Sequence, residues 1–117
     1  MTINSVNPKR GEIWFADFSP TVGREQSGLR PCVVVSANQF NESYAELVMV
    51  CPTTTKDRRI RSHIRLEAGE GGLRDVSFVK TDNLRSVSKE RLRNRIGMLT
   101  GSSLNQIEQC LRFLLDL

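Results

Sequence analysis

The chain has 117 residues, enough for one domain with a real hydrophobic core but not for two. Its 38% apolar and 26% charged residues exclude a disordered chain, no apolar run is long enough to span a bilayer, and the N-terminus lacks the features of a signal peptide, so we expect a cytoplasmic protein. The net charge of +4 permits an anionic partner without requiring one.

The N-terminal third predicts two strands joined by a polar loop. Residues 1–9 read as a loose lead-in, and residues 11–18 carry the apolar and aromatic side chains of a strand. A loop at 21–29 contains two glycines, and the continuous apolar run at 31–36 predicts a strand buried on both faces. A turn is expected at 38–43.

The middle of the chain predicts three more strands. Residues 47–51 form a buried run that leads into three consecutive threonines and a basic loop at 56–59. Residues 62–66 alternate as a half-exposed strand does, with Ile64 and Leu66 on one face. After a glycine-rich turn, residues 75–80 predict another strand.

The last third ends in the clearest helix of the chain. Residues 84–87 are expected to extend the sheet, Ser88 to cap a short and weak helical turn, and residues 96–99 to form one more short strand. Ser103 and Gln106 have the spacing of a capping box, and the helix that follows has an apolar stripe of Leu104, Ile107, Leu111 and Leu114.

These elements predict a mainly β fold with α, in one domain covering residues 1–117. Five to seven short strands with closely spaced turns favour a small barrel, closed or nearly so, with the terminal helix over an end or edge.

The residues that are missing restrict the chemistry. The three cysteines, at 32, 51 and 110, form no C-x-x-C pair and are expected to be buried free thiols. His63 is the only histidine and is expected on a strand surface, which excludes a pair of catalytic histidines within one chain. No metal-ligand spacing or phosphate-binding glycine loop occurs, so we expect no metal and no cofactor.

What remains suits phosphoryl chemistry on RNA. Arginine beside a hydroxyl can stabilise the charge that builds on phosphoryl oxygens, and the ribose 2′-OH supplies the nucleophile. Arg30 is therefore assigned to charge stabilisation, and Glu25 is the candidate general base. Two basic clusters also favour nucleic acid: Lys56, Arg58, Arg59, Arg61 and Arg65, then Lys89, Arg91, Arg93 and Arg95.

Several motifs resemble the MazF/PemK family of toxin endoribonucleases. They are Arg10-Gly-Glu-Ile-Trp14, Gly23-Arg-Glu-Gln-Ser-Gly-Leu-Arg-Pro31 and Val50-Cys-Pro-Thr-Thr54, and the resemblance extends over about residues 9–117. It implies an SH3-like barrel with appended helices, a homodimer, metal-independent cleavage of single-stranded RNA to a 2′,3′-cyclic phosphate and a 5′-OH, and neutralisation by an acidic antitoxin.

Carried over residue by residue, the resemblance implies that Arg30 and Thr53 are catalytic and that Glu25 and Gln26 support them. Because alternate strand residues face opposite sides, Thr53 and Thr55 are expected to share a face and Thr54 to point away, and Thr54 is the catalytic alternative if the strand end bulges. The RNA path is expected to include Arg24, Gln26, Thr54, Lys56, Arg58 and Arg59. A toxin like CcdB, which poisons DNA gyrase without nuclease chemistry, is the alternative function.

Overall fold

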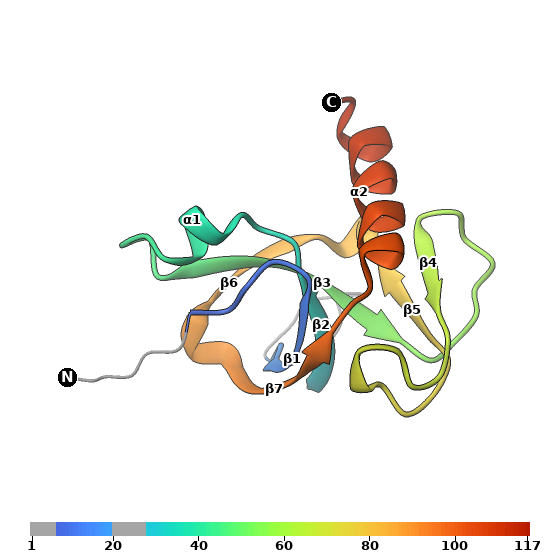
Figure 1. Cartoon of the computed structure of the whole chain (residues 1–117), viewed down its shortest axis with the longest axis horizontal. Helices are drawn as coiled ribbons and strands as arrows, with labels where there is room; N and C mark the ends of the chain where they lie inside the picture. Colours follow the sequence, from blue (N-terminus) through green and yellow to red (C-terminus); the bar gives the residue numbers. More distant parts are fainter. Residues whose placement is uncertain (1–6, 20–27) are drawn as a thin grey trace.

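The computed structural model describes residues 7–19 and 28–117, and these form a curved antiparallel sheet with a terminal helix (Figure 1). The strands are β1 (Glu12–Asp17), β2 (Leu29–Val34), β3 (Leu47–Thr54), β4 (His63–Leu66), β5 (Ser77–Lys80), β6 (Arg85–Ser88) and β7 (Leu92–Met98). The helices are α1 (Asn38–Asn41) and α2 (Gly101–Leu115), with three 3-10 turns, η1 (Glu70–Gly72), η2 (Thr81–Asn83) and η3 (Lys89–Arg91).

β3 organises the sheet. The strand order is β4-β5-β3-β2-β1-β7, and β6 pairs with the first half of β3 while β5 pairs with its last two residues. Every pairing is antiparallel. The strand pairings of the described residues do not join β4 to β7, so the predicted barrel is present as a curved sheet that stays open between these two edges.

The two faces of the sheet bury separate apolar clusters. One contains Ile13, Val33, Cys51, Val79 and Ile107, which places it between the sheet and α2. The other contains Trp14, Phe18, Val34, Val48 and Val87, on the alternate positions of the same strands. The alternation follows from the two-residue period of strand side chains.

Aromatic and sulfur side chains match the expectation of core packing. Trp14 is buried while its neighbour Phe15 is half-buried, as expected of adjacent strand residues. Cys32 and Cys51 are buried free thiols and Cys110 is half-buried. Burial raises the pKa of Cys32 and of Cys51 to about 12, with further increases from Cys51 on Cys32 and from Cys110 and Asp82 on Cys51. Both buried sulfurs are therefore neutral packing groups at physiological pH.

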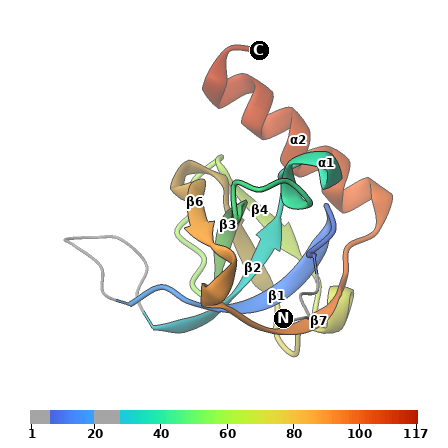
Figure 2. The ribbon, with the colours of Figure 1, turned by 90° about the vertical axis from the view of Figure 1, so that its left-hand side faces the viewer.

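The terminal helix begins earlier than its capping box predicts. Thr100 is the N-cap, and its hydroxyl oxygen accepts from the Ser103 N–H at 3.2 Å, so Ser103 lies inside α2 rather than before it. Ile107 is buried and Leu111 packs on the same core, as the stripe predicts. α1 and α2 lie on the same side of the sheet, and the C-terminal half of α2 extends away from it (Figure 2).

Three local predictions can be compared with the structure in detail. Residues 38–41 form one helical turn, α1, within the expected turn. The last strand, β7, spans seven residues instead of four, because it follows β1 along the sheet edge with its arginines outward. Ser88 does cap a short helical turn, but the turn is 3-10. None of the helices in the described part of the chain has the length and apolar character needed to cross a membrane.

Candidate functional site

Arg30 and Thr53 come together where β2 begins and β3 ends. Antiparallel pairing aligns Cys32 with Pro52, which brings the two strand ends side by side. The Thr53 hydroxyl donates to the carbonyl oxygen of Pro31, directly after Arg30, at 3.1 Å. The Arg30 side chain is exposed. The Thr53 hydroxyl is therefore fixed on the backbone of β2, one residue after Arg30.

The two candidate threonines differ in environment. Thr53 is 3% exposed and pairs with Val79, on the face that carries Cys51 and the α2 core. Thr54 is half-buried and, by alternation, shares its face with Pro52 and therefore with Arg30 on β2. Its hydroxyl oxygen accepts from the Lys56 N–H at 3.1 Å, which leaves the hydroxyl hydrogen available to a ligand.

A third cation, Lys80 at the end of β5, lies in the same region. Phe78 pairs with Thr54, so Lys80, two residues on, belongs to the face of Thr54 and Arg30. Burial lowers the pKa of Lys80, Asp82 raises it, and the positive charges of Arg58 and Arg30 lower it further. The charges of Arg30 and Arg58 thus both act on Lys80, and these three residues are named here the cation cluster.

Sequence reasoning did not include Lys80 among the site residues. The alternating pattern placed it on a strand face with Phe78, but only the pairing of β5 with the end of β3 brings that face beside Arg30. An isolated lysine on a short strand gives no signal of this neighbourhood.

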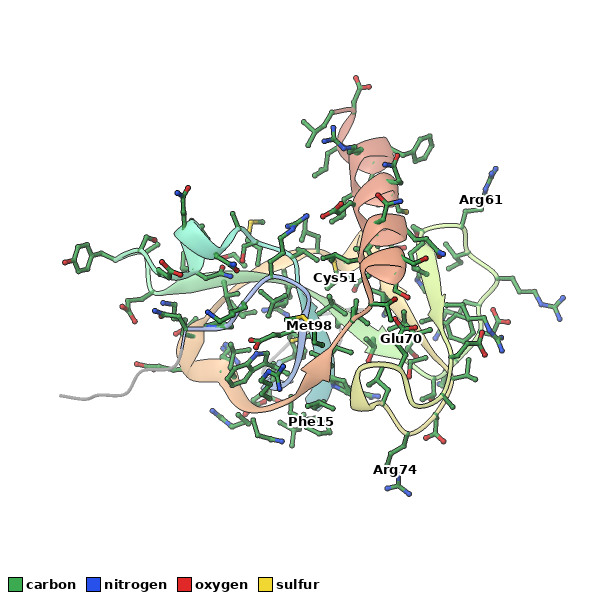
Figure 3. The ribbon with its side chains drawn as sticks, viewed as in Figure 1. Phe15, Cys51, Arg61, Glu70, Arg74 and Met98 are labelled. Atoms are coloured by element: carbon green, nitrogen blue, oxygen red, sulfur yellow. The ribbon has the colours of Figure 1, made fainter. Side chains whose placement is uncertain are left out.

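The basic loop between β3 and β4 carries Lys56, Arg58 and Arg59, all exposed. It starts at the Thr54–Lys56 hydrogen bond, and the Asp57 carboxylate accepts from the Arg59 N–H at 2.9 Å. At its far end, Ser62 donates to the Asp82 carboxylate at 2.9 Å. Figure 3 shows Arg61 of this loop pointing away from the body of the molecule. The loop therefore displays positive charge from two fixed ends.

Asp82 is the carboxylate beside the cation cluster. Burial alone would raise its pKa, but hydrogen bonds from Asn83 and Ser62 and the charges of His63 and Lys80 lower it overall. His63 Nε2 lies 3.5 Å from its Oδ1. The His63 side chain is only 3% exposed, so the expected surface position was wrong: strand β4 turns it toward η2. Its Nδ1 has no hydrogen-bond partner among the described residues.

Three of the predicted site residues, Arg24, Glu25 and Gln26, lie outside the described residues. The ends of their loop are described. The Phe18 N–H donates to the Gly28 carbonyl at 2.9 Å, and the Gly28 N–H donates to Ser19 Oγ at 3.2 Å. The chain therefore leaves the sheet near Phe18 and re-enters it at Leu29, directly before Arg30.

The second basic cluster makes contacts within the chain. Arg91 donates to the carbonyls of Asp17 and Ser19, and Arg93 lies 3.4 Å from the Asp17 carboxylate. Arg95 donates to Glu12 at 2.6 Å. Burial alone would raise the pKa of Glu12, but hydrogen bonds from Lys9, Trp14 and Arg95 lower it overall. Arg93 and Arg95 thus attach β7 to β1, and Arg91 attaches η3 to the end of β1 and to Ser19.

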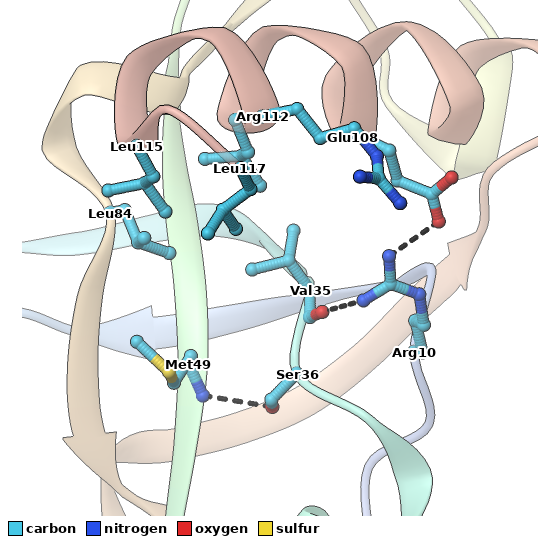
Figure 4. Close-up of a pocket in the computed structure, with 10 residues that line it drawn as sticks. Arg10, Val35, Ser36, Met49, Leu84, Glu108, Arg112, Leu115 and Leu117 are labelled. Atoms are coloured by element: carbon cyan, nitrogen blue, oxygen red, sulfur yellow. Dashed lines mark hydrogen bonds and ion pairs between the residues drawn. The ribbon is translucent and has the colours of Figure 1, made fainter.

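A separate apolar groove of about 400 Å³ runs between α2 and the sheet (Figure 4). Arg10 closes one end by pairing with Glu108 and donating to the Val35 carbonyl. Beyond this pair, apolar side chains line the groove: Met49, Leu84, Leu111, Leu115 and Leu117.

Comparison with known proteins identifies related chains of the same size. Endoribonuclease EndoA from Bacillus subtilis is 29% identical over 111 residues, covering 93% of this chain and 95% of its own length. Endoribonuclease MazF9 from Mycobacterium tuberculosis is 32% identical over 114 residues, covering 93% and 97%.

Solved structures share the fold. MazF from Deinococcus radiodurans superposes with a TM-score of 0.85 at 25% identity, over 97% of this chain and all of that one. A mycobacterial endoribonuclease in complex with its cognate antitoxin superposes with a TM-score of 0.76 over 95% of each chain, at 23% identity. Residues 9–115 match the family model of PemK-like, MazF-like toxins of type II toxin–antitoxin systems. The chain therefore belongs to the PemK/MazF family of toxins.

Proposed function

We propose that this chain is an endoribonuclease toxin that cuts single-stranded RNA, messenger RNA in particular, in the cytoplasm and without a metal ion. The observation that carries the proposal is the pairing of β2 with β3, which sets the exposed Arg30 one residue from the bond between Thr53 and Pro31 and on the sheet face of the Thr54 hydroxyl. The related endoribonucleases of Bacillus subtilis and Mycobacterium tuberculosis, matched over nearly their full length, support the activity.

The reaction is transesterification within the RNA. The ribose 2′-oxygen attacks the adjacent phosphorus, the bond from phosphorus to the 5′-oxygen breaks, and the products carry a 2′,3′-cyclic phosphate and a 5′-hydroxyl. Glu25 takes the 2′-hydroxyl proton, and the departing 5′-oxygen takes a proton from water as the bond breaks. Arg30 stabilises the negative charge on the phosphoryl oxygens, since its guanidinium stays protonated throughout.

We assign the catalytic hydroxyl to Thr53, which the family motif favours, and an RNA-binding role to Thr54. Thr53 contributes a hydroxyl fixed on the carbonyl of Pro31, the residue after Arg30, and Thr54 contributes a half-exposed hydroxyl on the face of Arg30. The RNA path includes Lys56, Arg58 and Arg59 of the basic loop, with Arg24 and Gln26 of the first loop. These groups can bind phosphates along a single strand.

The partners follow from charge and from exposed apolar surface. An acidic antitoxin segment is attracted to the cation cluster and the basic loop, and it blocks RNA by occupying them. The mycobacterial relative solved with its cognate antitoxin supports such a partner. A homodimer is the second assignment, because Leu115 and Leu117, which line the groove beside α2, are 52% and 80% exposed.

The test is cleavage of a long single-stranded RNA transcript by the purified protein in EDTA, with the fragment ends analysed chemically. We expect discrete cuts with 2′,3′-cyclic phosphate and 5′-hydroxyl ends, and a loss of at least about a hundredfold in rate for Arg30→Ala. Arg74→Ala removes an equally exposed arginine from the connection between β4 and β5 and should keep full activity (Figure 3).

Two outcomes would overturn the proposal. Cleavage that needs added magnesium would contradict the metal-free mechanism. Intact RNA together with trapped DNA–gyrase complexes would replace nuclease activity with gyrase poisoning.

A further inference from the structure

Lys80 occupies an unusual position for a lysine. It ends β5, pairs with His63 of β4, and its side chain is half-buried on the sheet face of Thr54 and Arg30. Lysine is rarely buried unless a counter-charge compensates it. The charge of Lys80 is therefore expected to interact with an anion.

The carboxylate that acts on the charge of Lys80, that of Asp82, also makes contacts with other residues. It accepts hydrogen bonds from Ser62 at 2.9 Å and from Asn83 at 2.9 Å, and it lies 3.5 Å from His63. These contacts hold η2 against the start of β4. The carboxylate therefore serves the local structure as well as the charge of Lys80.

The cation cluster gives a stronger reason to expect that an anionic ligand binds near Lys80. Desolvation and the charges of Arg58 and Arg30 disfavour the ammonium form of Lys80, and together they outweigh the opposing charge of Asp82, so the pKa of Lys80 is lowered overall. Three cations held close together from three separate elements raise the free energy of the unbound protein. A multivalent anion placed among them removes this cost, so the arrangement is suited to a phosphate backbone.

We propose that Lys80 is a further RNA-binding residue, whose ammonium contacts the same stretch of phosphate backbone as Arg30 and Arg58. The identity of the anion as RNA depends on the proposed function. The contact would add one phosphate interaction from β5 to those of the strand end and the basic loop.

The test measures how the affinity for a single-stranded RNA depends on salt. The probe is a fluorescent 20-nucleotide random-sequence oligomer made entirely of 2′-O-methyl RNA, which lacks the attacking hydroxyl. The slope of log affinity against log salt is negative, and losing one phosphate contact to a single strand should make it less steep by about 0.7. We expect this for Lys80→Met, and we expect Lys80→Arg to restore the wild-type slope.

Lys89→Met is the matched control. Lys89 is also half-buried, but it lies at the other end of β3, where Ser88 pairs with Leu47, and it donates to Asn7 at 2.9 Å. The control loses the same charge, so its slope should equal that of the wild type. Thermal unfolding of each variant separates lost folding from lost binding.

Each outcome decides the proposal. A Lys80→Met protein with the slope of the Lys89→Met control overturns it, as does a protein that unfolds at lower temperature yet binds RNA with unchanged salt dependence. If Lys80→Met does not fold, the same comparison is made with Lys80→Gln. Should the wild type cut no RNA, the proposed function fails, whereas the salt slopes still test the Lys80 contact.

Discussion

At the scale of single residues, the two threonines after Pro52 show how neighbours in sequence acquire different tasks. Strand alternation sends Thr53 to the side of the α2 core and Thr54 to the side of Arg30. The Thr53 hydroxyl compensates for burial by donating to the Pro31 carbonyl. The Thr54 hydroxyl instead receives the N–H of Lys56 and is half-exposed.

Replacing each threonine by valine separates these tasks. Thr53→Val keeps the shape but removes the bond to Pro31, so we expect a loss of about 1 kcal/mol in the free energy of unfolding and the loss of RNA cleavage. Thr54→Val should unfold like the wild type, bind RNA more weakly and still cut it. Urea unfolding and cleavage in EDTA measure both effects.

Thr53→Ser keeps the hydroxyl and should retain cleavage, which controls for the change in side-chain shape. The opposite result, an inactive Thr54→Val beside an active Thr53→Val, would transfer the catalytic hydroxyl to Thr54.

At the scale of elements, the hydrophobic pattern of the sequence was sufficient to predict the strands that carry buried apolar side chains. Val33, Val48 and Ile64 lie in runs that were predicted as strands and form β2, β3 and β4. The pattern failed for β7, where Arg93, Asn94 and Arg95 are exposed and polar. That strand forms because its backbone pairs with β1 and its arginines reach Asp17 and Glu12, partners far away in sequence.

The residues of the candidate site also divide into those that the sequence predicts and those that it does not. Arg30 could be found from the sequence because its loop motif is specific, and in the structure the next residue, Pro31, accepts the Thr53 hydroxyl. The position of Lys80 and the burial of His63 could not be found, since they depend on β5 pairing with β3 and on η2 lying beside β4. Long-range pairing supplies information that local periodicity does not contain.

The contact between β7 and η1 tests element packing directly. A Cβ built on Gly97 would lie 2.3 Å from the carbonyl oxygen of Gly71, a backbone atom that no side-chain rotation can move. We expect Gly97→Ala to lower the free energy of unfolding by about 1 to 3 kcal/mol, as an overpacked site does. Urea unfolding at constant pH measures the loss.

Gly101→Ala is the control for this prediction. It meets no atom within 4 Å and lies in the first turn of α2, so alanine there should be neutral or stabilising by up to about 1 kcal/mol. Equal stability of the two variants would show that η1 can move away from β7.

At the scale of the whole molecule, positive charge and apolar surface occupy different regions. The cation cluster and the basic loop lie where β2, β3 and β5 meet, whereas the exposed leucines lie at the end of α2. The second basic cluster is used within the chain, so the net charge of +4 understates how concentrated the available charge is around Arg30. The surface proposed for RNA and the surface proposed for a second copy of the chain are therefore separate.

The end of α2 provides the last prediction, the oligomeric state. Leu115 and Leu117 are 52% and 80% exposed and border the groove that Met49 and Leu84 line on the sheet side. Burying this surface against a second copy would contribute about 25 cal/mol for each Å² of apolar area removed from water. We expect a dimer at micromolar concentration and a monomer after the double change Leu115→Glu and Leu117→Glu, measured by light scattering after size exclusion.

Gln106→Glu is the control, because it adds a negative charge to an exposed position on the same helix before the groove. It should leave the dimer intact. A monomeric wild type, or a double variant that is still a dimer, would move the interface away from α2. Since leucines at the surface are not needed to hold α2 on the sheet, where Ile107 is buried, the monomeric variant should unfold as cooperatively as the wild type.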